Sequence, residues 1–93
     1  MTSKPDSGRQ NLDNDQHYVY VVRCSDDSLY TGYTTDVDRR IQEHNDGEGA
    51  KYTRGRNPVE LVHVEGYSSR EEAMSHEHEI KQMTRTHKLE LVE

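Results

Sequence analysis

Three stretches of the chain have the residue pattern of β-strands. Residues 18–24 read Tyr-Val-Tyr-Val-Val-Arg-Cys, and residues 29–34 form a second run after the polar cluster Ser-Asp-Asp-Ser. β-Branched and aromatic residues favour strands, and a short polar turn joins two strands into a hairpin. Residues 59–67 alternate Leu61, His63 and Glu65 with valines. The pattern therefore predicts a hairpin and, later in the chain, a third strand.

Two further stretches follow the helical period. Thr35 or Asp36 can cap a helix that ends near residue 45. Ser68 and Ser69 begin two overlapping capping boxes, and the helix after them is expected to reach about residue 84. Residues 46–58 are interpreted as a loop and residues 89–92 as a short additional strand. The order β-β-α-β-α indicates an α+β fold, with a small three-stranded antiparallel sheet flanked by helices.

A length of 93 residues fits one domain. Residues 1–16 are polar and show no period, so they are interpreted as a flexible N-terminal tail, which leaves residues 17–93 as the domain. Cys24 is the only cysteine, which excludes an internal disulfide and favours the cytoplasm as the compartment. Because no run approaches the roughly 18 apolar residues of a membrane span, no membrane association is expected.

The formal net charge of −6 argues against a protein that binds nucleic acid over its whole surface. Basic residues nevertheless gather in two places. One group lies in the predicted loop, and the other follows the last predicted helix: Lys51, Arg54 and Arg56, then Lys81, Arg85 and Lys88. If the chain binds nucleic acid, these two groups are the expected phosphate contacts.

Each predicted helix carries one charged residue on or beside its apolar face. Arg40 lies three residues after Val37, and Glu77 lies four residues after Ala73. One interpretation is a structural ion pair between Arg40 and Glu77. The other is a functional site in which the guanidinium holds a phosphate and the carboxylate holds a divalent ion.

The predicted hairpin places tyrosines on neighbouring strands. Tyr20 shares a face of the first strand with Tyr18 and Val22, and Tyr30 shares a face of the second with Gly32. Strand tyrosines commonly pack in a core, but a phenol beside a phosphate can also position or deprotonate water. A glycine inside a strand indicates that a ligand or another backbone approaches closely.

These motifs, taken in order, resemble the GIY-YIG nuclease domain. Residues 18–20 (Tyr-Val-Tyr) and 30–32 (Tyr-Thr-Gly) are similar to its paired motif, although Tyr18 stands where the family name has glycine. Arg40 and Glu77 fall where that family has an arginine and a glutamate. The resemblance extends over about residues 17–92 and is strongest to the small stand-alone YhbQ-like group, through residues 29–32, 34–40, 49–54 and 77–84.

The resemblance implies a three-stranded sheet flanked by helices, one divalent ion (Mg²⁺ or Mn²⁺) and hydrolysis of a DNA phosphodiester. Tyr30 would act as general base or orient the attacking water, and Tyr20 would support it. Arg40 would stabilise charge on the phosphate, and Glu77 would ligate the ion. His44, one helical turn after Arg40, would shuttle a proton or contact phosphate.

DNA is the implied partner. Gly32 would let its backbone approach closely, and the two basic groups would hold it through Lys51, Arg54, Lys81 and Arg85. A domain without a separate recognition domain is also expected to use a partner protein for targeting. The favoured function is a divalent-metal-dependent endonuclease in DNA repair or recombination. The alternatives are an inactive nucleic-acid-binding module of the same fold and a purely structural domain.

Overall fold

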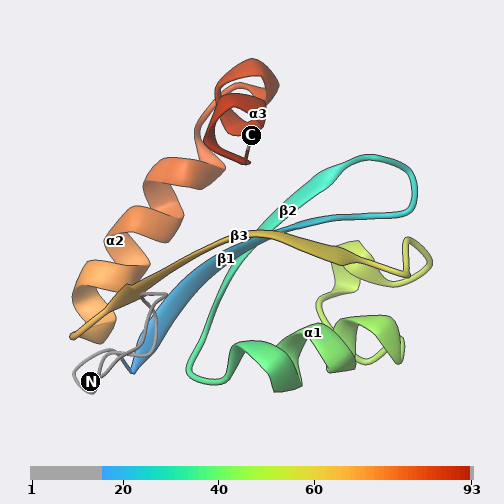
Figure 1. Cartoon of the computed structure of the whole chain (residues 1–93), viewed down its shortest axis with the longest axis horizontal. Coiled ribbons are helices and arrows are strands. Elements are labelled where there is room, and N and C mark those ends of the chain that lie inside the picture. Colours follow the sequence, from blue (N-terminus) through green and yellow to red (C-terminus); the bar gives the residue numbers. More distant parts are fainter. Residues whose placement is uncertain (1–15, 93) are drawn as a thin grey trace, which may run out of the picture.

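A computed structural model of the chain describes residues 16–92, so the tail expected over residues 1–16 lies outside the described residues, apart from Gln16. The predicted α+β fold is confirmed (Figure 1). The elements in chain order are β1 (His17–Arg23), β2 (Leu29–Thr34), α1 (Val37–Asn45), the 3₁₀ helix η2 (Lys51–Thr53), β3 (Glu60–Tyr67), α2 (Arg70–Lys81) and α3 (Arg85–Val92).

The three strands form one antiparallel sheet in the order β2-β1-β3, with β1 in the centre. The register pairs Tyr20 with Gly32 and Val22 with Tyr30. These four residues therefore lie on the same face of the sheet, since residues opposite each other in a ladder point the same way. The predicted hairpin thus brings the two candidate tyrosines to one surface.

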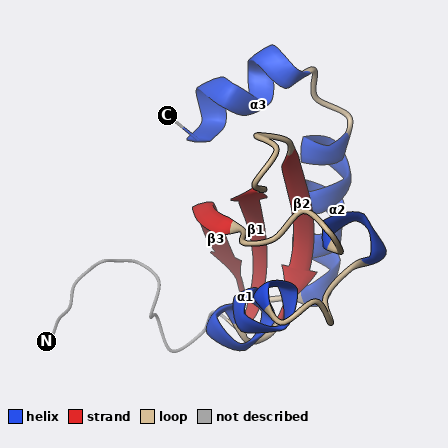
Figure 2. Cartoon of the chain, turned by 90° about the vertical axis from the view of Figure 1, so that its right-hand side faces the viewer, coloured by secondary structure: helices blue, strands red, loops and turns tan. Residues whose placement is uncertain are grey.

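The sheet has a small core on each face, and Figure 2 shows α1 in front of the sheet and α2 behind it. Val19 and Val21 of β1 pack with Ala73 and Ile80 of α2. On the opposite face a second cluster contains Tyr20, Val22, Cys24 and Val59, with Tyr30, Ile41 and Val64 packed against it. Side chains that alternate along β1 therefore contribute to the cores on both faces of the sheet.

The strand expected over residues 89–92 is wrong, because these residues belong to the helix α3. The Thr84 hydroxyl accepts a hydrogen bond from the backbone N–H of His87 at 3.2 Å, as an N-terminal cap does. Leu91 and Val92 then pack against the core on the α2 face. A helix satisfies the backbone internally while still burying these side chains, which a lone strand could not do. In residues 16–92, no helix combines the length and apolar character needed to cross a bilayer.

Candidate active site

Tyr20 lies at the centre of the candidate site, on the face of β1 that α1 covers. Its side chain is 1% exposed. The ring of Tyr30 lies diagonally across the hairpin, with the two ring centroids 6.4 Å apart and the planes inclined by 51°. The two tyrosines are therefore neighbours, but Tyr20 is buried and Tyr30 only partly so.

The Tyr20 ring lies directly against Gly32 and leaves no room for a side chain there. A Cβ atom at Gly32 would lie 2.6 Å from Cζ of the Tyr20 ring, closer than any real Cβ contact allows. The space beside Gly32 is thus filled by the tyrosine, and Gly32 itself is buried. Among the described residues, the close approach that a glycine inside a strand indicates is therefore made by the Tyr20 ring.

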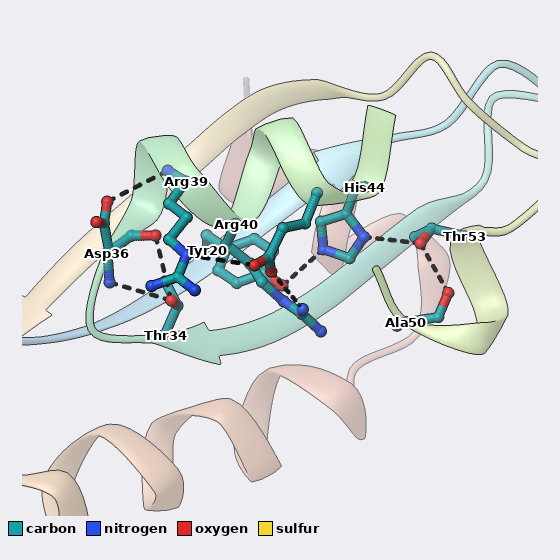
Figure 3. A network of polar contacts seen from close by, with 9 residues as sticks. Tyr20, Thr34, Asp36, Arg39, Arg40, His44, Ala50 and Thr53 are labelled. Atoms are coloured by element: carbon teal, nitrogen blue, oxygen red, sulfur yellow. Dashed lines mark hydrogen bonds and ion pairs between the residues drawn. The ribbon is translucent and has the colours of Figure 1, made fainter. Parts of the chain in front are cut away.

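His44 connects Tyr20 to the loop after α1 (Figure 3). Its ring is fully buried, with Nε2 2.8 Å from the Tyr20 hydroxyl and Nδ1 2.7 Å from Oγ1 of Thr53. The Thr53 hydroxyl also donates to the Ala50 carbonyl at 2.9 Å. A chain of hydrogen bonds therefore runs from the sheet, through α1, to η2.

The direction of these bonds follows from the donors available. Because the single Thr53 proton goes to Ala50, Oγ1 must accept from Nδ1–H of His44. In the neutral imidazole Nε2 then carries no proton and accepts from the Tyr20 hydroxyl. The Tyr20 oxygen keeps its lone pairs for other donors.

Burial is the main reason that the pKa of Tyr20 rises to about 12, with Arg40 acting in the opposite direction. Burial also lowers the pKa of His44, and the positive charge of Arg40 adds to that effect. Both shifts favour the neutral forms. At neutral pH the site therefore holds a protonated phenol and an uncharged imidazole.

Arg40 enters the site from α1. Its Nη1 donates to the Glu43 carboxylate at 2.8 Å, and its side chain also lies within hydrogen-bonding reach of the Tyr20 hydroxyl. The hydrogen bond with Arg40 lowers the pKa of Glu43, which stays ionised. A pocket of about 310 Å³ opens beside the guanidinium, lined by Tyr33, Thr34, Thr35, Asp36, Arg39, Arg40 and Glu43.

Glu77 projects from the inner face of α2 and is 8% exposed. It pairs with Lys81, one turn later, at 3.2 Å, while Arg40 pairs with Glu43. The direct Arg40–Glu77 ion pair considered from sequence is therefore wrong, because each residue finds its partner on its own helix. The charge of Glu77 acts on the pKa of Tyr20 in the same direction as burial.

A divalent ion would find one carboxylate here rather than a cage. In residues 16–92 no three His, Cys, Asp or Glu side chains gather into a metal site. Mg²⁺ commonly uses one or two carboxylates and fills its remaining positions with water and substrate phosphate. The partly exposed Lys81 ammonium is on a flexible stem and can yield its place at Glu77. The residues present therefore fit such an ion.

The four basic residues expected to contact nucleic acid have different surroundings. Lys51 and Arg54 are exposed at η2 and directly after it. Lys81 is bound to Glu77, and Nη2 of Arg85 donates to the backbone carbonyl of Asp27 at 3.0 Å. The first two are therefore open to solution, whereas the other two also serve contacts within the domain.

Several residues that contact His44 and Arg40 cannot be recognised from the sequence pattern. The sequence pattern does not identify Thr53 and Glu43 as parts of the site, and it indicates Gly49 only as a loop residue. A Cβ atom at Gly49 would lie 2.8 Å from Cγ of His44. Glu43 could have been found from its spacing of three and four residues from the two arginines. Gly49 and Thr53 carry no such signal, since only the folded loop brings them to His44.

Unfolding at mildly acidic pH should report on His44. In the unfolded chain an imidazole titrates near pH 6.5, whereas burial keeps the folded pKa lower. Below about pH 6.5 the unfolded state therefore binds a proton that the folded state does not, and the free energy of unfolding falls. We expect His44→Gln to lose part of this decline between pH 7 and pH 5 in urea titrations, whereas His87→Gln, at an exposed position, should keep it. Parallel curves for the wild type and His44→Gln would contradict the assignment.

Comparisons with known proteins agree with the fold and the motifs. The GIY-YIG catalytic domain family matches residues 16–90. A UPF0213 protein of Haloquadratum walsbyi is 68% identical over 80 residues, which cover 86% of this chain and 90% of that protein. One from Staphylococcus haemolyticus is 58% identical over 78 residues, covering 84% and 95%. The solution NMR structure of a UPF0213 protein from Bacillus halodurans has a TM-score of 0.55 and 58% identity, covering 82% of this chain and 81% of that one. The chain therefore belongs to the GIY-YIG catalytic domain family.

Proposed function

We propose that the protein is a divalent-metal-dependent endonuclease that hydrolyses DNA phosphodiester bonds, with a role in repair or recombination. The observation that carries this proposal is the buried hydrogen bond between Tyr20 and His44, with the partly exposed Arg40 guanidinium beside it and a buried carboxylate, Glu77, on α2. Membership of the GIY-YIG catalytic domain family supports it.

Arg40 is the proposed phosphate ligand. A guanidinium has five N–H donors, and the bond to Glu43 uses only part of them. The remaining donors can meet the oxygens of a phosphodiester entering the adjacent pocket. Negative charge grows on those oxygens as the attacking water adds to phosphorus, and a fixed guanidinium then gives the most stabilisation.

The tyrosines are proposed to handle the attacking water. With a pKa of about 12, Tyr20 remains protonated and cannot begin as a phenolate base. Its oxygen can accept a hydrogen bond from water while its own proton points to Nε2 of His44. Tyr20 and His44 are proposed to support the group that takes the proton of the attacking water. Tyr30, beside Tyr20, is the proposed general base or water-orienting group.

Glu77 is the proposed protein ligand of one Mg²⁺ or Mn²⁺ ion. A bound divalent ion lowers the pKa of water and neutralises charge on the phosphate. Glu77 is suited to this role because it is the only buried carboxylate among the described residues.

Replacement of Glu77 by glutamine tests the proposal. We expect Glu77→Gln to lower cleavage of labelled linear, single-stranded and branched DNA in Mg²⁺ or Mn²⁺ by about 10²-fold or more, because loss of a catalytic ion costs several kcal/mol. Glu79→Gln is the matched control, since its side chain is 66% exposed on the same helix. Circular dichroism would verify that both variants fold.

Equal cleavage by the wild type and Glu77→Gln would exclude this site. An inactive nucleic-acid-binding module is the second candidate, favoured by the Lys81–Glu77 ion pair, which occupies the buried carboxylate. That candidate predicts DNA binding without metal, no cleavage of any substrate, and a steep loss of affinity with salt. A partner protein for targeting remains part of the proposal for either function.

A further inference from the structure

A stack of three side chains leads from the candidate site to the surface. The Tyr52 ring of η2 lies on Tyr30, with centroids 5.7 Å apart and planes only 20° from parallel. The guanidinium carbon of Arg56 lies 4.3 Å from the centre of the Tyr52 ring. Planar groups in this arrangement attract one another by dispersion and by cation–π interaction. The stack therefore begins beside Tyr20 and ends at an arginine.

The outer end of the stack is exposed yet held in place. Tyr52 is 42% exposed, and the Arg56 side chain is 38% exposed. Nη1 of Arg56 pairs with Asp26 at 2.7 Å, and its backbone carbonyl accepts from the N–H of Ser25 at 2.8 Å. The turn of the β1–β2 hairpin thus fixes the loop that carries the stack. An exposed aromatic residue with fixed planar neighbours loses little entropy when a ligand binds.

We propose that Tyr52 and Arg56 form a stacking site for an unpaired nucleobase of the DNA substrate, an inference that rests on the proposed function for the identity of the ligand. A base offers a flat π-face, and both aromatic rings and guanidinium planes stack on such faces. Exposed Lys51 and Arg54 flank Tyr52 in the sequence and can meet the phosphates on either side of the base.

The site selects for single-stranded or splayed DNA. Within a duplex both faces of each base are covered by its neighbours, so a surface platform gains nothing from stacking. Because Tyr30 is the inner ring of the same stack, a base held at the outer end places its backbone beside the candidate catalytic groups. The substrate class is therefore DNA that has an unpaired nucleotide next to the cleaved bond.

Tyr52→Trp provides a direct readout, because the chain contains no tryptophan. The introduced indole keeps its place in the stack, and its fluorescence should be quenched when a base adds to the outer end of that stack. We expect strong quenching by a single-stranded oligonucleotide in EDTA, and little by the same sequence as a duplex or with an abasic site. Met74→Trp is the control, since Met74 is 38% exposed on α2 and outside the stack; it should respond to none of them.

Arg56→Lys separates stacking from charge. Lysine keeps the charge but lacks the guanidinium plane, so single-strand affinity should fall about tenfold while its salt dependence is unchanged. Single-stranded DNA that binds without quenching the indole, or that fails to bind, would overturn the stacking site even if cleavage is intact. Normal quenching in a protein that cleaves no DNA would leave the stacking site standing and overturn the nuclease instead.

Discussion

Arg40→Gln should lower the kcat of DNA cleavage about 10²- to 10³-fold while the domain stays folded. This is the effect of removing one preorganised donor from a site where negative charge develops. Arg40 is suited to that role because its bond to Glu43 holds the guanidinium beside the open pocket. Its ion pair is partly exposed, so its loss should change the free energy of unfolding by no more than about 1 kcal/mol.

Arg39→Gln is the comparison variant for this prediction, because Arg39 also lines the pocket and tests whether any arginine there would serve. Arg39 is the preceding residue, lies 3.4 Å from the same Glu43 carboxylate, and is 75% exposed. Kinetics under saturating DNA and thermal unfolding by circular dichroism would be measured for both variants. If Arg40→Gln unfolds the domain, or if Arg39→Gln loses as much activity, Arg40 is a structural residue or one of several interchangeable surface charges.

Residue periodicity predicts most of the fold and the inner positions of the site. The alternation along residues 18–24 and the 3.6-residue period of two helices were sufficient to place Arg40 and Glu77 on buried faces. The partners of these residues were not predictable in the same way. Each has an opposite charge three or four residues away, and such a local partner needs no tertiary geometry, so it forms before a long-range pair.

The environment of His44 illustrates why the rest could not be read from the chain. The sequence places His44 one helical turn after Arg40, but a histidine in that position can face solvent or core. Its full burial depends on Thr53, nine residues later, and on Gly49, where any side chain would collide with the imidazole. Loop conformation decides both contacts, and a loop has no period from which contacts can be inferred.

Gly49→Ala should destabilise the domain by about 2–3 kcal/mol and break the connection between His44 and Tyr20. The φ angle of Gly49 is not in the left-handed region, so alanine would ordinarily stabilise by restricting the unfolded chain. Here the new Cβ would lie 2.9 Å from Cα of His44 as well as against its ring, and a backbone atom cannot rotate away. Overpacking of this kind costs about 1–3 kcal/mol or more.

Gly47→Ala is the control that isolates the effect of crowding. Gly47 has a φ of 81° and no atom within 4 Å of an added Cβ. Alanine there should cost only the backbone strain of the left-handed region, about 1–2 kcal/mol, and should leave cleavage unchanged.

Urea unfolding gives the stability of each variant, and the decline in stability below pH 6.5 reports whether His44 is still buried. If Gly49→Ala stabilises the domain and keeps that decline, the loop can move away from the imidazole. Burial against the rings of Tyr20 and Tyr30, without the loop, would then have to account for the lowered pKa of His44.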